Sequence, residues 1–286
     1  MVDLGRPRRV RWAVAVCALV LAVGLSWWLY LPVRGAGRQS WAVRRYIVAG
    51  VPLFLPPFGA PRSGGGWVGL DVELARQVAQ AALGNPGRVH VLPLEPGQRV
   101  WAVRTGAADI VMAGYSAGDP AAAPVGVRLI GPYLTAPLAL LVRRGDPVRA
   151  WSQLDGREVG VLSGRTALRR AAGPSASYTV EETEVPGAAA RGLALGHLRA
   201  LVGPLPVLQA LSGYDPALAV QQEPLLGSER YWVMVPGTAA ALVPAVEKGI
   251  AALPQGAALQ RLLTQWANAV ALPAPRPLLT LYLAPA

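Results

Sequence analysis

The sequence is poor in the residues that form disulfides and bind metals. It contains one cysteine, Cys17, so neither an intrachain disulfide nor a cysteine metal cluster can form. The two histidines, His90 and His197, lie far apart, with no H-x-x-x-H pattern and no clustered acids beside them. We therefore predict no metal site, and no motif points to a cofactor.

Lysine is also nearly absent. Lys248 is the only lysine among 27 basic residues, although the formal net charge is +11. This preference for arginine, together with abundant alanine, glycine and proline, is what GC-rich coding produces. The basic runs are short, and no basic stripe is interleaved with aromatic residues, so we expect no nucleic-acid partner.

Charge is missing altogether from residues 12–33, WAVAVCALVLAVGLSWWLYLPV. A helix of this length, at about 1.5 Å per residue, spans the roughly 30 Å hydrocarbon core of a bilayer. Arginines in residues 1–11 place that end in the cytoplasm, and aromatic residues at the far end suit the opposite interface. We expect an uncleaved, single-pass transmembrane signal anchor, a linker at 34–45 and a body on the periplasmic or extracellular side of the cell membrane. Cleavage near residues 35–37 remains the alternative.

Beyond the linker, strand-like and helix-like patterns alternate. The predicted strands are 46–51, 89–94, 108–113, 138–142, 159–162, 178–184, 200–202, 218–222 and 231–235. The predicted helices are 71–83, with Asp71 as a plausible N-cap, 98–105, 187–195, 239–252 and 256–267.

Such alternation predicts an α/β fold with mostly parallel sheets. We divide the body into two lobes joined by hinge strands, with lobe 1 formed by 46–136 and 231–271 and lobe 2 by 137–230. The Pro-rich tail at 272–286 is not assigned to either lobe. Folds of this kind bind small molecules in the cleft between their two halves.

The segment Gly114-Tyr115-Ser116-Ala117-Gly118 matches G-x-S-x-G, the nucleophile elbow of serine hydrolases. An elbow requires a helix directly after it, but Gly118, Pro120 and Pro124 oppose a long helix there. His90 lies inside a predicted strand and His197 in a predicted loop, so neither is a convincing base. We therefore expect Ser116 to be a hydrogen-bonding residue at a strand end and the protein not to be an enzyme.

Four motifs, in order, resemble the polar amino-acid-binding family of periplasmic solute-binding proteins from ABC importers. They are Leu55-Pro56-Pro57-Phe58 with Gly69-Leu70-Asp71-Val72; Val103 to Ile110; Pro132-Tyr133 with Leu140 to Arg143; and Leu154 to Val161 with Gly164-Arg165-Thr166. The resemblance covers about residues 46–267. It implies a two-lobed periplasmic-binding-protein fold of type II and a small solute held between the lobes.

The resemblance also implies two charged anchors that this sequence lacks. The family places an arginine for the ligand's α-carboxylate where Ala121 stands, and an aspartate for the α-amino group where Pro204 stands. Each charge-assisted hydrogen bond is worth about 1.5–3 kcal/mol, so we expect weak binding of ordinary α-amino acids and a degenerate ligand site.

The function that we expect is capture of a small polar or anionic solute for an ABC permease by a membrane-anchored binding protein. The alternative is an accessory or assembly factor that keeps the fold, has lost its ligand and binds another extracytoplasmic or membrane protein. The candidate ligand-binding residues are Phe54 and Leu55 as an apolar wall, Tyr115 and Ser116 at a strand end of lobe 1, and Ser163, Arg165 and Thr166 in lobe 2. Arg165 could hold an anion together with backbone amides at a helix start, or it could be a surface residue.

Overall fold

The computed structural model describes residues 40–62, 64–117, 119, 121, 123–154, 156–162, 179–183, 186–221 and 227–270, with the backbone alone at 179–183. Within these ranges no helix is long and apolar enough to cross a bilayer. The predicted membrane anchor at 12–33 and the Pro-rich tail lie outside the described residues.

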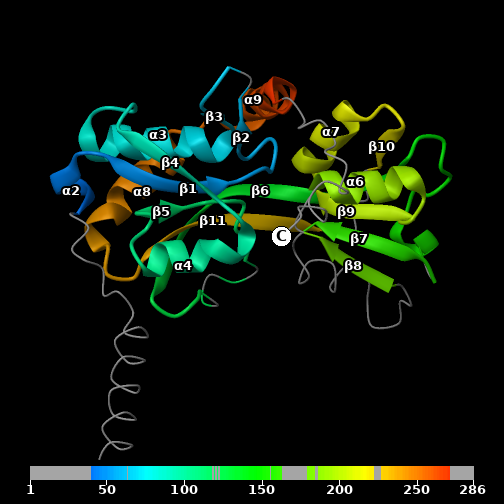
Figure 1. Ribbon diagram of the computed structural model, residues 1–286, viewed down its shortest axis with the longest axis horizontal. Coiled ribbons are helices and arrows are strands. Elements are labelled where there is room, and N and C mark those ends of the chain that lie inside the picture. Colours follow the sequence, from blue (N-terminus) through cyan, green and yellow to red (C-terminus); the bar gives the residue numbers. More distant parts are fainter. Residues whose placement is uncertain are drawn as a thin grey trace, which may run out of the picture. The chain divides into compact units, whose positions relative to one another are not determined.

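A sheet of nine strands forms the frame of the body (Figure 1). Its order is β4-β1-β5-β11-β6-β9-β7-β8, and β10 also pairs with β6. The strands are β1 Ile47–Pro52, β4 Val89–Leu94, β5 Ile110–Val111, β6 Val127–Arg143, β7 Glu158–Leu162, β8 Thr179–Thr183, β9 Ala200–Pro204, β10 Leu218–Gln221 and β11 Ser228–Pro236. A separate hairpin pairs β2 Ala60–Pro61 with β3 Trp67–Val68.

Strand β6 belongs to both halves of the sheet and joins them. Its residues 127–137 pair with β11, and residues 138–143 pair with β9 and β10. The two lobes are therefore the strands β4, β1, β5 and β11 on one side, and β9, β7, β8 and β10 on the other. The sequence pattern predicts only the part of β6 at 138–142, whereas the strand has 17 residues.

The pairing directions make the two lobes face each other with the same strand ends. β1, β4 and β5 are mutually parallel, and β5 is antiparallel to β11, which is itself antiparallel to β6. In the second lobe β7, β8 and β9 are mutually parallel, and β9 is antiparallel to β6. The carboxyl ends of the parallel strands in each lobe therefore point toward the other lobe, which is the edge where α/β sheets place their ligands.

Helices cover both faces of the first lobe. Alternate strand residues such as Ile47, Ala49 and Val51 pack on α3 (Leu70–Leu83) and α8 (Val243–Ala251). Val48 and Val111 instead pack on α4 (Arg99–Arg104), on the other face. This alternation along β1 reflects the period of two in a strand, so both faces of the sheet are apolar and buried.

The other helices in the described part of the chain are α2 (Trp41–Arg44), α6 (Pro186–Leu195), α7 (Leu205–Tyr214) and α9 (Gly256–Ala269), with 3-10 turns at Pro96–Gln98, Trp151–Leu154 and Ala240–Leu242. The sequence pattern does not predict α7, although Pro206 suits the first turn of a helix. The hydroxyl of Tyr214 in α7 donates to the carbonyl of Ala267 in α9, so these two helices are in contact.

Helix α2 fixes the end of the predicted linker to the first lobe. The guanidinium of Arg44 donates to both carboxylate oxygens of Asp109, at 2.7 and 2.5 Å, and the backbone N–H of Val48 donates to the same carboxylate at 2.8 Å. Because Asp109 directly precedes β5 and Val48 is the second residue of β1, this pair joins α2 to the amino edge of the sheet.

One sequence prediction about a helix end is wrong. Asp71 does not cap α3, because the N-cap residue is Gly69, with φ 135°. A side chain at position 69 would place its Cβ 2.3 Å from the carbonyl oxygen of Phe58, so the close approach of these two segments requires glycine. Asp71 lies within the first turn and is fully buried, with partners that are described below.

The crossing of α3 and α8 gives a test of this packing. A Cβ at Gly249 in α8 would lie 2.9 Å from the backbone nitrogen of Val78, so Gly249→Ala is expected to destabilise the fold by about 1–3 kcal/mol, measured by urea unfolding. Gly213→Ala in α7 is the matched control, since nothing lies within 4 Å of its Cβ position. The packing described here is contradicted if both substitutions stabilise the protein equally.

Candidate ligand site

A buried carboxyl group organises the carboxyl edge of the first lobe. One carboxylate oxygen of Asp71 accepts a hydrogen bond from the backbone N–H of Gly114 at 3.2 Å, and the other accepts one from the hydroxyl of Tyr133 at 2.8 Å. Ala113 and Gly114 both have positive φ, 47° and 65°, so the chain turns sharply after β5. Asp71 therefore connects this turn to the start of α3 and to β6.

Burial dominates the ionisation of this group. It raises the pKa of Asp71 from 3.8 to about 7, although the hydrogen bonds from Tyr133, Gly114 and Ala113 and the positive charge of Arg99 act in the opposite direction. Burial also raises the pKa of Tyr133 well above 10, and the neighbouring Asp71 carboxyl adds to that rise. The pair is thus held in a nearly dry environment beneath the strand end.

Leu55, one of the predicted wall residues, lies against this turn. Its Cδ2 atom is 2.6 Å from the position that a Cβ on Gly114 would occupy, so the two residues are in close contact. The backbone of Leu55 bridges to Gly59, which folds the segment after β1 back on itself. Phe54, the other predicted wall residue, is half-buried beside it. The segments after β1 and after β5 thus meet at one edge.

Tyr115, Ser116 and Ala117 continue as an extended segment along β11. Ser116 bridges to Tyr231, the N–H of Ala117 donates to the carbonyl of Arg230 at 3.2 Å, and the N–H of Trp232 donates to the carbonyl of Tyr115 at 3.0 Å. Tyr115 is half-buried, and burial raises the pKa of its hydroxyl while Arg99 lowers it. Ser116 therefore lies in an extended strand-like segment, whereas a nucleophile elbow would place it in a sharp turn leading into a helix.

The histidine nearest in sequence does not support hydrolysis either. His90 is the second residue of β4, at the amino end of that strand, and its ring stacks on Tyr46 with a centroid separation of 4.1 Å. Ser116 follows the carboxyl end of β5, so the two side chains belong to opposite edges of the same sheet.

The two positions where the resemblance implies charged anchors carry local backbone roles. The N–H of Ala121 donates to the carboxylate of Asp119 at 2.8 Å. Pro204 ends β9 and serves as the N-cap residue of α7, at the carboxyl edge of the second lobe. Both positions therefore lie in segments that follow strand ends. Ser163, Arg165 and Thr166 lie outside the described residues.

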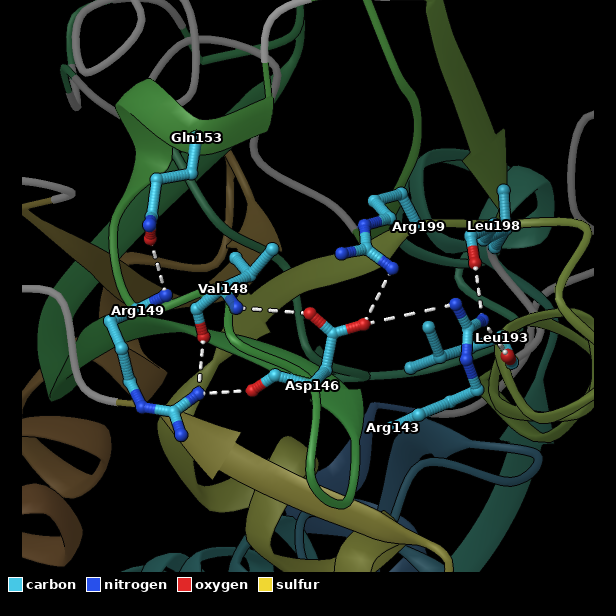
Figure 2. Close-up of polar contacts among 8 residues, drawn as sticks. All are labelled: Arg143, Asp146, Val148, Arg149, Gln153, Leu193, Leu198 and Arg199. Carbon is cyan, nitrogen blue, oxygen red and sulfur yellow. Dashed lines mark hydrogen bonds and ion pairs between the residues drawn. The ribbon is translucent and has the colours of Figure 1, made fainter.

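Sequence reasoning missed the polar network at the outer end of the second lobe (Figure 2). The side chain of Asp146 is 4% exposed. It forms an ion pair with Arg199 at 2.6 Å and a longer one with Arg143 at 3.8 Å. Arg143 also donates to the carbonyls of Leu193 and Leu198, at 2.9 and 3.1 Å. This network joins the end of β6 to α6 and to the start of β9.

The network lies at the end of β6 and just before β9, away from the carboxyl edge, and it links segments of the second lobe. Its members come from three separate segments, and only the fold brings them together. The sequence showed merely a short basic run, Arg143-Arg144, followed by Gly145 and Asp146.

Comparison with known proteins identifies the family. The model of the bacterial extracellular solute-binding proteins, family 3, matches residues 47–269. This chain belongs to that family. The match agrees with the resemblance drawn from the four motifs. Because members of the family are solute receptors, the prediction that the protein is not an enzyme is confirmed.

A curated relative, the general L-amino acid-binding periplasmic protein AapJ of Rhizobium johnstonii, is 28% identical over 156 residues. The matched part is 54% of this chain and 44% of AapJ, so the chain covers less than half of that protein.

Solved structures share the two-lobed fold. The solute receptor for L-cysteine of Neisseria gonorrhoeae is 25% identical, with a TM-score of 0.66 over 79% of this chain and 91% of that one. The amino acid ABC transporter substrate-binding protein AbpA of Streptococcus pneumoniae, bound to L-arginine, is 22% identical, with a TM-score of 0.66 over 79% and 96%. The predicted α/β fold with two lobes is thereby confirmed.

The buried Asp71 carboxyl predicts a pH-dependent stability. Its pKa is higher in the folded protein than in the unfolded chain, so the unfolded chain loses this proton first as the pH rises. The unfolding free energy of the wild type, minus that of Asp71→Asn, should therefore decrease as the pH rises from 4 to 7. The decrease amounts to at most about 1.4 kcal/mol per unit of pKa difference, and the value is constant at higher pH. Urea unfolding at several pH values measures it.

Glu247→Gln, on the exposed face of α8, is the matched control for this pH series. If the wild type and Asp71→Asn differ by the same free energy at every pH from 4 to 8, the raised pKa of Asp71 is wrong.

Proposed function

We propose that this chain is a membrane-anchored, extracytoplasmic receptor that captures a small polar or anionic solute between its lobes and delivers it to an ABC permease. The observation that carries the proposal is the contact of Leu55 with Gly114 at the carboxyl edge of one lobe, two residues before Ser116, in a chain whose residues 47–269 match a family of solute receptors. The anchor at 12–33 is part of the proposal, with residues 1–11 in the cytoplasm and 34–45 as the linker.

The proposed ligand-binding residues come from both lobes. Phe54 and Leu55 form an apolar wall, and Tyr115 and Ser116 offer hydroxyl and backbone groups at the strand end. From the second lobe we propose Ser163, Arg165 and Thr166, which follow β7 in the sequence. Arg165 would supply a positive charge from the second lobe, since the position in the first lobe where the family has an arginine is occupied by Ala121.

Receptor function has more support than the accessory-factor alternative. Of the relatives named above, AapJ is described as a general L-amino acid-binding protein, the receptor of Neisseria gonorrhoeae as one for L-cysteine, and AbpA as bound to L-arginine. No relative named above is described as an assembly factor. The absence of charge at Ala121 and Pro204 leads us to propose a solute other than an ordinary α-amino acid.

A ligand screen tests the function. The full chain in detergent is mixed with L-amino acids, glutathione, dicarboxylates, α-keto acids and neutral polyols, and its melting temperature is measured. We expect an anionic compound to raise the melting temperature, because ligands that bind only the folded state stabilise it. If no compound raises it while a membrane protein co-purifies, the accessory-factor alternative replaces the receptor.

Arg165→Ala identifies the anion-binding group in the same assay. We expect it to abolish the shift caused by the anionic compound, since it removes a charge-assisted hydrogen bond. Arg157→Ala is the matched control, because Arg157 is exposed just before β7, at the opposite end of that strand from Ser163. Equal shifts in both variants would remove Arg165 from the site.

Restoring the two anchors gives an independent test. The double variant Ala121→Arg, Pro204→Asp should bind free L-amino acids at least about tenfold more tightly per anchor than wild type, as measured by calorimetry. Position 121 is exposed, and aspartate is a favoured N-cap residue, but position 204 is buried, so urea unfolding and circular dichroism first check that the double variant is folded. Ala81→Arg, on the exposed side of α3, is the control. A double variant that folds but binds no amino acid would show that the two positions do not face a common ligand.

A further inference from the structure

A second buried carboxyl group lies in the strands that join the lobes. Glu229 is 4% exposed and is the second residue of β11, paired in register with Ala136 of β6. The neighbouring pair, Ser228 with Pro137, is the last of the β6–β11 ladder on the side of the second lobe. Glu229 is therefore located where the chain passes from one lobe to the other.

Only one of its two carboxylate oxygens has a partner among the described residues. Oε2 accepts a hydrogen bond from the hydroxyl of Tyr231 at 2.8 Å. Oε1 is buried, and the described part of the chain offers it no hydrogen-bond donor. An ionised oxygen in this position would lack both water and a donor, which is costly. Burial accordingly raises the pKa of Glu229 to about 7, although the bond from Tyr231 lowers it.

The surroundings of this carboxyl connect it to the ligand edge. The ring of Tyr231 lies 4.7 Å from that of Phe58, just after the Leu55 segment, and 6.4 Å from that of Tyr133. Tyr133 donates in turn to Asp71. Two carboxyl–phenol pairs thus lie side by side. Asp71 and Tyr133 hold the turn after β5, and Glu229 and Tyr231 lie in β11, which with β6 forms what we call the crossing strands.

Among the described residues, the charged groups that bear on the two pairs are Arg99 and Arg230. Arg99 attracts Asp71 and Tyr133, but burial and the Tyr231 bond are the influences identified on Glu229 itself. Arg230, the next residue of β11, is exposed and alternates to the other face of the strand, beside Trp232. From β6, the residue paired with Glu229 is the apolar Ala136.

We propose that separation of the two lobes is linked to proton release from Glu229. The protonated carboxyl is neutral and fits the dry position between the crossing strands, so it favours the arrangement described here. The ionised carboxyl needs water at Oε1, and water reaches it when the segments packed over β6 and β11 move apart. Rising pH therefore favours the open arrangement of the lobes, which would release a solute held between them.

The proposal is tested on the full chain in detergent without any ligand, so its outcome does not depend on the identity of the solute. Spin labels on Gln80→Cys in α3 and Gln209→Cys in α7, both exposed, report the distance between the lobes in a Cys17→Ser background. Pulsed electron paramagnetic resonance between pH 5.5 and 8.5 should give a distance distribution that changes with a midpoint near pH 7.

Two substitutions assign the change to this carboxyl. Glu229→Gln removes the titrating group and should abolish the transition, leaving the low-pH distribution at every pH. Tyr231→Phe removes the donor that favours the ionised form and should move the midpoint to higher pH. Glu247→Gln, on the exposed face of α8, is the control and should titrate like the parent.

Circular dichroism checks that each variant is folded. If Glu229→Gln does not fold, the midpoint measured for Tyr231→Phe decides whether the proposal holds. The proposal is overturned if the distance distribution of the parent does not change with pH. It is also overturned if folded Glu229→Gln keeps the transition, or if Tyr231→Phe leaves the midpoint unchanged.

Discussion

The carboxyl group of Asp71 is the contact on which the candidate site depends. Its two oxygens bind Gly114 after β5 and Tyr133 in β6, while its backbone belongs to the first turn of α3. Three segments that are distant in sequence are therefore held at one buried point. The turn at Ala113 and Gly114 has positive φ, which is unfavourable for Ala113 without such support. The support comes from an acid whose pKa is raised to about 7 by burial in the surrounding core.

The turn held by Asp71 determines which residues lie at the carboxyl ends of the strands in the first lobe. The parallel strands of both lobes point their carboxyl ends at each other because β6 runs through both halves, in the same direction as β1 and β5 but antiparallel to β9. The turn held by Asp71 sends Tyr115 to Ala117 along β11, so the edge of the first lobe and the crossing strands form one continuous backbone surface. Because residues 115–117 are hydrogen-bonded to β11, a displacement of β11 also displaces Tyr115 and Ser116, which we propose to contact the solute.

Much of the fold could be predicted from the sequence, because hydrophobic periodicity determines it. The strands at 89–94 and 159–162 and the helices beginning near 71 and 256 have the patterns of buried strands and amphipathic helices, and the structure has them within one residue or so. The full length of β6 and the presence of α7 were missed, since Pro132, Pro137 and Pro206 look like breaks in a linear pattern. Pro206 lies in the first turn of α7, where a backbone N–H has no partner within the helix.

The site was only partly accessible to sequence reasoning, for a different physical reason. The family motifs led us to expect Leu55 in the wall of the site, but its contact with Gly114 was not predicted. The hydrogen bonds of Asp71 were not predicted either, because an acid near a helix start is ordinarily a cap. The buried oxygen of Glu229 carried no sequence pattern at all. Both acids are unusual through the absence of water around them, and that is a property of packing between distant segments. The sequence shows missing charges at Ala121 and Pro204, whereas the structure shows two carboxyl groups that remain and are buried, Asp71 beneath the turn after β5 and Glu229 in β11. Asp71 supports the turn, and the proposed effect on the position of the lobes belongs to Glu229 alone.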